Sequence, residues 1–319
     1  MDKRRIEIDI LKGLAILSVI CLHSLSYSEL LLIAAPFHIW QAVPVFIILA
    51  AYNNTQSYER MPGQSLLRGY QWTFLSKRLS RLLMPFVIVW IGQILIIVLR
   101  TDIDLKMIFL SFISGGWGPG NYFIPVIVQQ LFFLPILYWL TVKWKTKAVW
   151  LVFVLSMTFE VVSYLLGTPF SVYRLLYFRF LFASILGVWI AVYGVKLKPW
   201  ILLSIVSLMY IAGFYYFGYH LPIETQTGSQ NAPSFFYPLL LTVLGLLYLK
   251  GKTGFIWDVI AEIGQASYYI FLAQMAYFWI AKSIVNDLPY FMTPISIVIC
   301  CLCGYLFYKI ENSIRAKFS

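Results

Sequence analysis

The sequence predicts an all-α polytopic membrane protein with about ten transmembrane helices and both termini in the cytoplasm. Composition is the first observation behind this prediction: 61% of the 319 residues are hydrophobic and only 12% are charged, whereas soluble domains carry about 25% charged residues. The length of the apolar stretches and the distribution of the basic residues are the other two. Together they predict one integral membrane domain over residues 1–319, without a soluble domain.

The apolar stretches are long enough to cross a bilayer, which takes roughly 20 residues in a helix. Their charged residues lie mostly at the ends, as expected for spans joined by short loops. The expected spans are 9–27, 36–53, 82–99, 122–142, 147–166, 175–194, 199–218, 234–249, 266–285 and 291–309.

The basic residues orient these spans. With the N-terminus in the cytoplasm, every connection on that side is basic, and these segments hold most of the 24 lysines and arginines. The net charge of +11 therefore indicates an acidic lipid leaflet as the electrostatic partner, not nucleic acid. The cytoplasmic set is Lys3, Arg4, Arg5, Lys12, Arg60, Arg68, Lys77, Arg78, Arg81, Lys143, Lys145, Lys147, Lys196, Lys198, Lys250, Lys252, Lys309, Arg315 and Lys317.

The first span carries two ionisable side chains on one face. Lys12 and His23 are eleven positions apart, which is about three helical turns and roughly 16 Å along the axis. A cation at the membrane surface and a histidine near the bilayer centre therefore share one stripe, and Asp9 falls within about 40° of it. Ionisable groups inside spans are usually functional. The alternative is that His23 bonds a neighbouring helix and Lys12 only reaches the headgroups.

A second basic pair precedes the third span. Arg78 and Arg81 are three residues apart, so they share a helix face at the cytoplasmic surface. Guanidinium groups bind phosphates through two parallel hydrogen bonds, and with Lys12 they are candidates for holding a phosphorylated cofactor. An anchor to lipid headgroups remains the alternative.

Other polar groups are costly inside spans unless they are paired. Glu160 is expected to pair with Arg174 or Arg179 in a structural role. The connections 100–121 and 219–233 are predicted loops from their Gly, Pro and polar content, serving either as binding loops or as ordinary connections. The four cysteines lie in apolar runs without metal spacing, so we expect buried thiols and no metal site. The further polar groups inside spans are Gln129, Gln130 and Gln274, and Glu311 lies at the exit of the last span.

Motifs along nearly the whole chain resemble those of the membrane acyltransferase-3 family. The opening helix reads as a basic residue, ten residues and a histidine, and an Arg-x-x-Arg motif precedes the third span. The similar segments are 9–23, 78–85, 121–129, 177–187, 263–272 and 308–311. Two positions depart from the family pattern: Ala50-Ala51 replaces Ser-Gly in the second span, and Gln274 stands where histidine is common.

The resemblance implies transfer of an acyl group, expected to be acetyl, from cytoplasmic acyl-CoA to a hydroxyl of a cell-envelope polysaccharide or lipid-linked glycan precursor. It implies His23 as the base and Lys12, Arg78 and Arg81 as ligands of the CoA phosphates, in a bacterial plasma membrane with glycan-assembly proteins as possible partners. A polysaccharide exporter or flippase without acyl transfer is the alternative function, and a structural subunit is a third.

Overall fold

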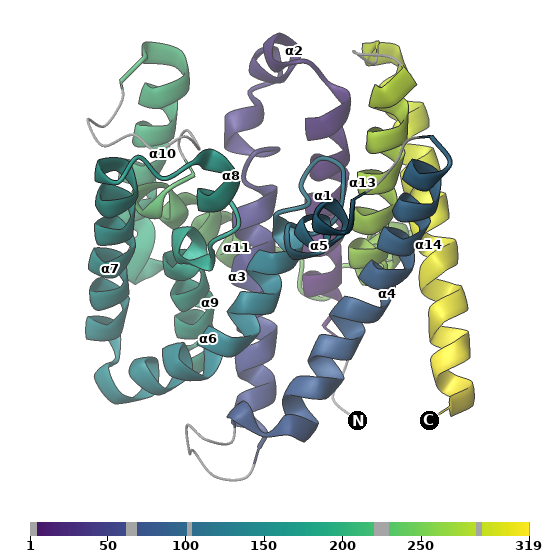
Figure 1. Ribbon diagram of the computed structural model, residues 1–319. Helices are drawn as coiled ribbons and strands as arrows, with labels where there is room; N and C mark the ends of the chain where they lie inside the picture. Colours follow the sequence, from purple (N-terminus) through teal and green to yellow (C-terminus); the bar gives the residue numbers. More distant parts are fainter. Residues whose placement is uncertain (1–4, 62–68, 101–103, 220–229, 285–288, 319) are drawn as a thin grey trace. The chain divides into compact units, whose positions relative to one another are not determined.

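The computed structural model describes residues 5–61, 69–100, 104–219, 230–284 and 289–318, and the described residues form helices joined by turns (Figure 1). Their contacts group into two compact units that alternate along the chain. Unit 1 comprises residues 1–40, 80–124 and 249–319, and unit 2 comprises 41–79 and 125–248. The predicted cytoplasmic residues Lys3, Arg4 and Arg68 lie outside the described residues, as do positions 101–103 and 220–229 of the two predicted loops.

Unit 1 is built from the two ends of the chain and one internal segment. Its helices are α1 (Ile6–Ser24), α2 (Tyr27–Leu32), η1 (Ala35–Phe37), most of α4 (Trp72–Val98), α5 (Leu105–Ile113), α12 (Phe255–Gln265), α13 (Ser267–Ile284), η6 (Tyr290–Met292) and α14 (Thr293–Phe318).

Unit 2 is built mainly from the middle of the chain. Its helices are α3 (Ala42–Glu59), the start of α4, nearly all of α6 (Phe123–Trp144), α7 (Thr146–Leu165), α8 (Phe170–Tyr173), η3 (Tyr177–Phe180), α9 (Leu181–Tyr193), η4 (Lys198–Trp200), α10 (Ile201–Phe217), η5 (Ala232–Phe235) and α11 (Phe236–Tyr248).

Among the described residues, 6 helical stretches are long and apolar enough to cross a membrane. Each coincides with an expected span, and shorter apolar helices occupy two others, 177–193 and 232–248. α1 and α13 also form where spans were expected, but α1 carries Glu7, Asp9 and Lys12 within its first two turns. The six stretches are Ala35–Glu59, Trp72–Val98, Phe123–Trp144, Thr146–Leu165, Lys198–Phe217 and Tyr290–Lys317.

Two expected connections contain helices. α5 lies inside the predicted loop 100–121, where the Asp104 side chain accepts a hydrogen bond from the backbone N–H of Lys106 and caps an apolar run. α12 lies directly before the ninth expected span and is separated from α13 by Ala266 alone. The Gly and Pro content of the first loop is confined to its second half, so composition averaged over the loop hid the helix.

The close contact between α1 and α12 depends on two glycines. A Cβ atom at Gly13 would stand 2.1 Å from the carbonyl oxygen of Ile260, and one at Gly264 would stand 1.7 Å from the carbonyl oxygen of Asp9. Larger residues at these positions would force the helices apart. The contact fixes α12 against the N-terminal half of α1, which carries Lys12.

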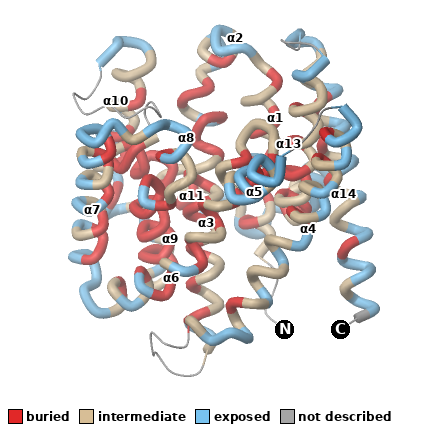
Figure 2. The backbone as a smooth tube through the Cα atoms, in the orientation of Figure 1, coloured by how far each residue is buried: buried red, intermediate tan, exposed pale blue. Residues whose placement is uncertain are grey.

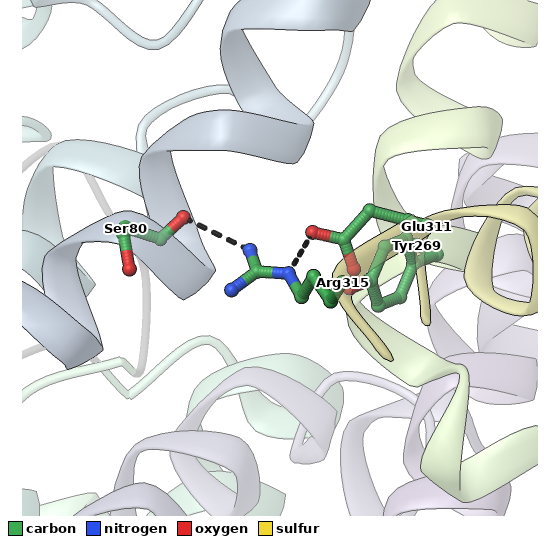
Figure 3. A network of polar contacts seen from close by, with 4 residues as sticks. All are labelled: Ser80, Tyr269, Glu311 and Arg315. Atoms are coloured by element: carbon green, nitrogen blue, oxygen red, sulfur yellow. Dashed lines mark hydrogen bonds and ion pairs between the residues drawn. The ribbon is translucent and has the colours of Figure 1, made fainter. Parts of the chain in front are cut away.

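Polar contacts hold α4, α13 and α14 together at the end of unit 1 where both chain termini lie (Figures 1 and 3). Glu311 pairs with Arg315 and accepts a hydrogen bond of 2.6 Å from the Tyr269 hydroxyl. Arg315 also donates to the carbonyl oxygen of Ser80, 3.3 Å away. The intramembrane carboxylate Glu311, expected to need a partner, therefore has two.

Unit 2 is organised around α9, whose residues from Leu181 to Ala191 are all buried (Figure 2). The helix crosses α3 closely because a Cβ atom at Gly187 would lie 2.3 Å from the carbonyl oxygen of Ile48 and 2.9 Å from Cβ of Ala51. A small residue at position 51 is therefore required, and alanine meets that need where the family pattern has Ser-Gly.

The buried carboxylate of unit 2 is held by tyrosine. The Tyr173 hydroxyl donates to both carboxylate oxygens of Glu160, at 2.8 and 2.7 Å. The guanidinium of Arg179 lies 5.5 Å from the Tyr173 ring centre and 4.5 Å from that of Phe180. Glu160 and Arg179, which is one of the two arginines expected to pair with it, therefore both contact Tyr173.

Candidate functional site

His23 lies near the C-terminal end of α1, against α13 and the loop before α6. Its ring centre is 6.0 Å from that of Phe278, edge to face. A Cβ atom built on Gly120 would stand 3.6 Å from Nε2 of His23. The side chain is only partly exposed, and none of the described residues forms a hydrogen bond with the ring. The imidazole therefore packs against Phe278 and faces the backbone at Gly120.

That segment, residues 114–121, is named the glycine loop here. Gly115, Gly116, Gly118 and Gly120 all have positive φ, between 81° and 115°, conformations that glycine adopts without strain. A Cβ atom at Gly118 would lie 2.3 Å from the carbonyl oxygen of Met275 on α13. The glycines therefore allow the backbone both to turn and to lie directly against α13.

Three amide side chains hold the glycine loop. Gln93 of α4 binds Trp117 twice: Nε2 donates to the carbonyl oxygen at 2.7 Å, and Oε1 accepts from the N–H at 3.1 Å. Asn121 donates to the carbonyl oxygen of Gly116 at 2.8 Å, and Gln274 donates to that of Pro119 at 3.4 Å. Loops buried without such partners leave costly unpaired backbone groups, so these amides are what allow the loop to lie among apolar helices.

Two of these amides keep an unused atom. Oδ1 of Asn121 and Oε1 of Gln274 are buried and have no hydrogen-bond partner within the described part of the chain. Gln274 is fully buried and Asn121 is 6% exposed. Both atoms are hydrogen-bond acceptors beside the loop that faces His23.

The basic end of unit 1 lies at the opposite end of α1. α1 is continuous from Ile6 to Ser24, so Lys12 and His23 share one face, roughly 16 Å apart along the axis. Lys12 is partly exposed, and Arg81 on α4 is exposed. The Tyr268 hydroxyl donates to the carbonyl oxygen of Leu82, which places this turn of α4 at the end of α13 that adjoins α12. Lys12 and Arg81 are thus at one end of unit 1.

Arg78 has a different environment. It belongs to unit 2, donates to Oδ1 of Asn54, and its guanidinium lies 3.8 Å from the ring centre of Phe74 and 5.9 Å from that of Tyr58. Stacking fixes the plane of the guanidinium. Arg78 is therefore oriented by protein contacts, whereas Arg81, three residues further along α4, extends outward.

The sequence proposed His23, Lys12 and both arginines as site residues, and α1 brings the first two onto one face as expected. It did not single out Gln93, it included Asn121 only as part of a motif, and it named Gln274 as a polar group inside a span and a departure from the family pattern. The signal was present: a run of glycines flanked by amide side chains in apolar helices is typical of buried irregular backbone that needs side-chain partners.

One of the three comparisons with known proteins gives a match. Comparison with curated proteins and with solved structures gives no match. A family model described as an acyltransferase domain matches residues 5–309, so the match includes His23, the glycine loop and both arginines. The chain therefore belongs to this membrane acyltransferase family.

Proposed function

We propose that this protein transfers an acyl group, acetyl in the simplest case, from cytoplasmic acyl-CoA to a hydroxyl of a cell-envelope polysaccharide or its lipid-linked precursor. The observation that carries the proposal is the position of His23: a ring without a hydrogen-bond partner among the described residues, facing the backbone of Gly120. A histidine so placed is able to act as a general base.

The chemistry needs no covalent enzyme intermediate. His23 takes the proton from the acceptor hydroxyl while its oxygen attacks the thioester carbonyl carbon. The carbon–sulfur bond then breaks, the acyl group remains on the acceptor oxygen, and the CoA thiolate leaves and takes up a proton. The products are the ester and free CoA.

The basic end of unit 1 supports binding of the CoA phosphates. Arg81 is exposed and Lys12 is partly exposed at that end, and cationic side chains so placed attract phosphate. The Arg-x-x-Arg motif adds Arg78, three residues before Arg81 on α4, as a third ligand of the phosphates in this proposal. The extended arm of the thioester would follow the face of α1 shared by Lys12 and His23.

The proposal includes a location. In this proposal the chain crosses a bacterial plasma membrane ten times, with both termini in the cytoplasm. The basic end of unit 1 then faces the cytoplasm, where acyl-CoA is made. The glycan acceptor then approaches His23 from the other end of α1, alone or delivered by glycan-assembly proteins.

The test replaces His23 by alanine and uses His38→Ala as the matched control, because His38 is an exposed histidine in the connection between α2 and α3. O-acetyl groups on envelope glycans are measured by mass spectrometry in cells that lack the protein and are complemented with each form. His23→Ala is expected to lower acylation about 100-fold or more, while His38→Ala restores it. Normal acylation by inserted His23→Ala protein would overturn the mechanism.

The phosphate contacts are tested with purified protein in nanodiscs. Lys12→Met and Arg81→Met are expected to raise KM for acetyl-CoA about tenfold each and to weaken the preference for acetyl-CoA over acetyl-dephospho-CoA. Wild-type protein that moves unmodified glycan without consuming the thioester would instead support an exporter.

A further inference from the structure

Two buried amide oxygens beside the loop that faces His23 have no hydrogen-bond partner among the described residues. The nitrogen of Gln274 donates to the carbonyl oxygen of Pro119, and that of Asn121 donates to the carbonyl oxygen of Gly116. A backbone carbonyl can only accept, so these contacts determine which end of each amide is the oxygen. Both oxygens are buried without a partner among the residues that the structure describes.

Both oxygens belong to the surroundings of His23. Gln274 lies on the face of α13 between Phe271 and Phe278, at spacings of three and four residues. Phe278 contacts the His23 ring, and the Phe271 ring lies 3.3 Å from a Cβ atom built on Gly120. Asn121 directly follows Gly120 in the chain. The two acceptors therefore flank the loop backbone that the imidazole faces.

An unpaired buried acceptor costs free energy, and native proteins keep few of them. Two such acceptors beside the glycine loop, next to a histidine without a hydrogen-bond partner among the described residues, indicate a ligand that brings hydrogen-bond donors to this place. A site built to receive hydroxyl groups rejects analogues that lack them much more strongly than an apolar pocket does.

We propose that Gln274 and Asn121 bind hydroxyl groups adjacent to the hydroxyl that is acylated, so that the acceptor is a vicinal diol or polyol such as a sugar ring. This inference rests on the proposed function and names the chemistry of its acceptor. The reacting hydroxyl gives its proton to His23, and the neighbouring hydroxyls donate to Oε1 of Gln274 and Oδ1 of Asn121. Gln274 thereby both holds the glycine loop and selects the acceptor.

The kinetic test compares two alcohols that differ in one hydroxyl, trans-1,2-cyclohexanediol and cyclohexanol, with acetyl-CoA as donor and protein in nanodiscs. Wild type is expected to acetylate the diol with at least about tenfold higher kcat/KM per hydroxyl. Gln274→Met and Asn121→Ala should each reduce that preference to less than about threefold. The control is Thr293→Val. The Thr293 hydroxyl on α14 is also buried and unpaired among the described residues, but Thr293 is neither in the glycine loop nor on α4 or α13, which hold it. This variant should keep the full preference for the diol.

The other outcomes overturn the proposal. If Gln274→Met raises KM for acetyl-CoA and leaves the diol preference intact, the oxygens bind the amide N–H groups of the pantetheine arm. If kcat falls equally for both alcohols with the preference unchanged, Gln274 and Asn121 only shape the loop.

A binding test separates this inference from the proposed function. In His23→Ala protein, where transfer is not expected, trans-1,2-cyclohexanediol should raise the thermal midpoint more than equimolar cyclohexanol does, and adding Gln274→Met should remove the difference. This result without any transfer by wild type would refute the proposed function and keep the diol site. Equal shifts for the two alcohols would refute the diol site whatever the transfer assay shows.

Discussion

Two stretches of backbone outside the α-helices, the glycine loop of unit 1 and residues 175–180 of unit 2, share one kind of contact. Each precedes an apolar helix, and in each of them one glutamine binds backbone through both ends of its amide. Gln93 binds the N–H and carbonyl of Trp117. Gln129 donates to the carbonyl oxygen of Leu175 at 2.7 Å and accepts from the N–H of Tyr177 at 3.2 Å.

The difference lies in what fills the space beside the held backbone. Residues 175–180 carry large side chains, and Tyr177 and Phe180 are fully buried against Phe133 and Phe235. Gly120 of the glycine loop has no side chain, so the loop backbone lies next to His23 at that point. One segment therefore fills a core with its side chains, whereas the other brings bare backbone close to the imidazole. The same glutamine contact therefore does not by itself distinguish a structural segment from a functional one.

The largest expected effect comes from adding one methyl group to the glycine loop. Gly118→Ala puts a Cβ atom 2.3 Å from the Met275 carbonyl oxygen at φ +115°. We expect a loss of about 3 kcal/mol of stability and no measurable transfer. The control is Gly167→Ala in the turn after α7, where φ is +57° and nothing lies within 4 Å of the new atom; it should cost about 1 kcal/mol and keep activity. Unfolding in detergent and acetyl transfer are the measurements, and equal losses for the two variants would show that the loop is not specially constrained.

A smaller effect is expected from removing the two glutamines. Gln93→Leu removes the hydrogen bonds of Gln93 to the N–H and the carbonyl oxygen of Trp117. Gln129→Leu removes those of Gln129 to the Tyr177 N–H and the Leu175 carbonyl oxygen. Each should lower stability by about 2–3 kcal/mol, because buried polar groups that lose their partners carry the full cost of desolvation. Only Gln93→Leu should also lower kcat of the protein that remains folded. A comparable fall of kcat in folded Gln129→Leu would contradict the distinction drawn between the two segments.

The smallest effect concerns the surface hydrogen bonds at the start of α2. The backbone N–H and the hydroxyl of Ser26 donate to the Glu29 carboxylate at the start of α2, and these bonds lower the pKa of Glu29 from its ordinary value of 4.5. A lowered pKa means that the stabilisation of α2 is complete above about pH 4.5 and is lost as the pH falls through the folded-state value. The protection of the α2 amides against hydrogen exchange, relative to their intrinsic exchange rates, should therefore fall below pH 4.5 in wild type. In Glu29→Gln the same amides should exchange with no step in that range, and a step of equal size there would assign the titration to another group.

The sequence by itself determined the features that depend on composition and on spacing within one helix. The apolar lengths predicted where helices form, including α1, α13 and α14, because the hydrocarbon core sets a minimum length for any span. The alignment of Lys12 with His23 followed from helix geometry alone. The need of Glu311 for a partner followed from the cost of an unpaired charge in an apolar segment.

Only the tertiary structure decided which residues from distant parts of the chain meet. The sequence left the glycine loop open between a binding loop and an ordinary connection, because its role depends on the packing of α4 and α13 around it. Gln93 and Gln274 are far from the loop in sequence, and nothing local distinguishes a glutamine that binds backbone from one that faces lipid or solvent. The sequence could not predict that the oxygens of Asn121 and Gln274 lack a partner among the described residues, since an unpaired atom is a property of the whole environment and not of its own residue.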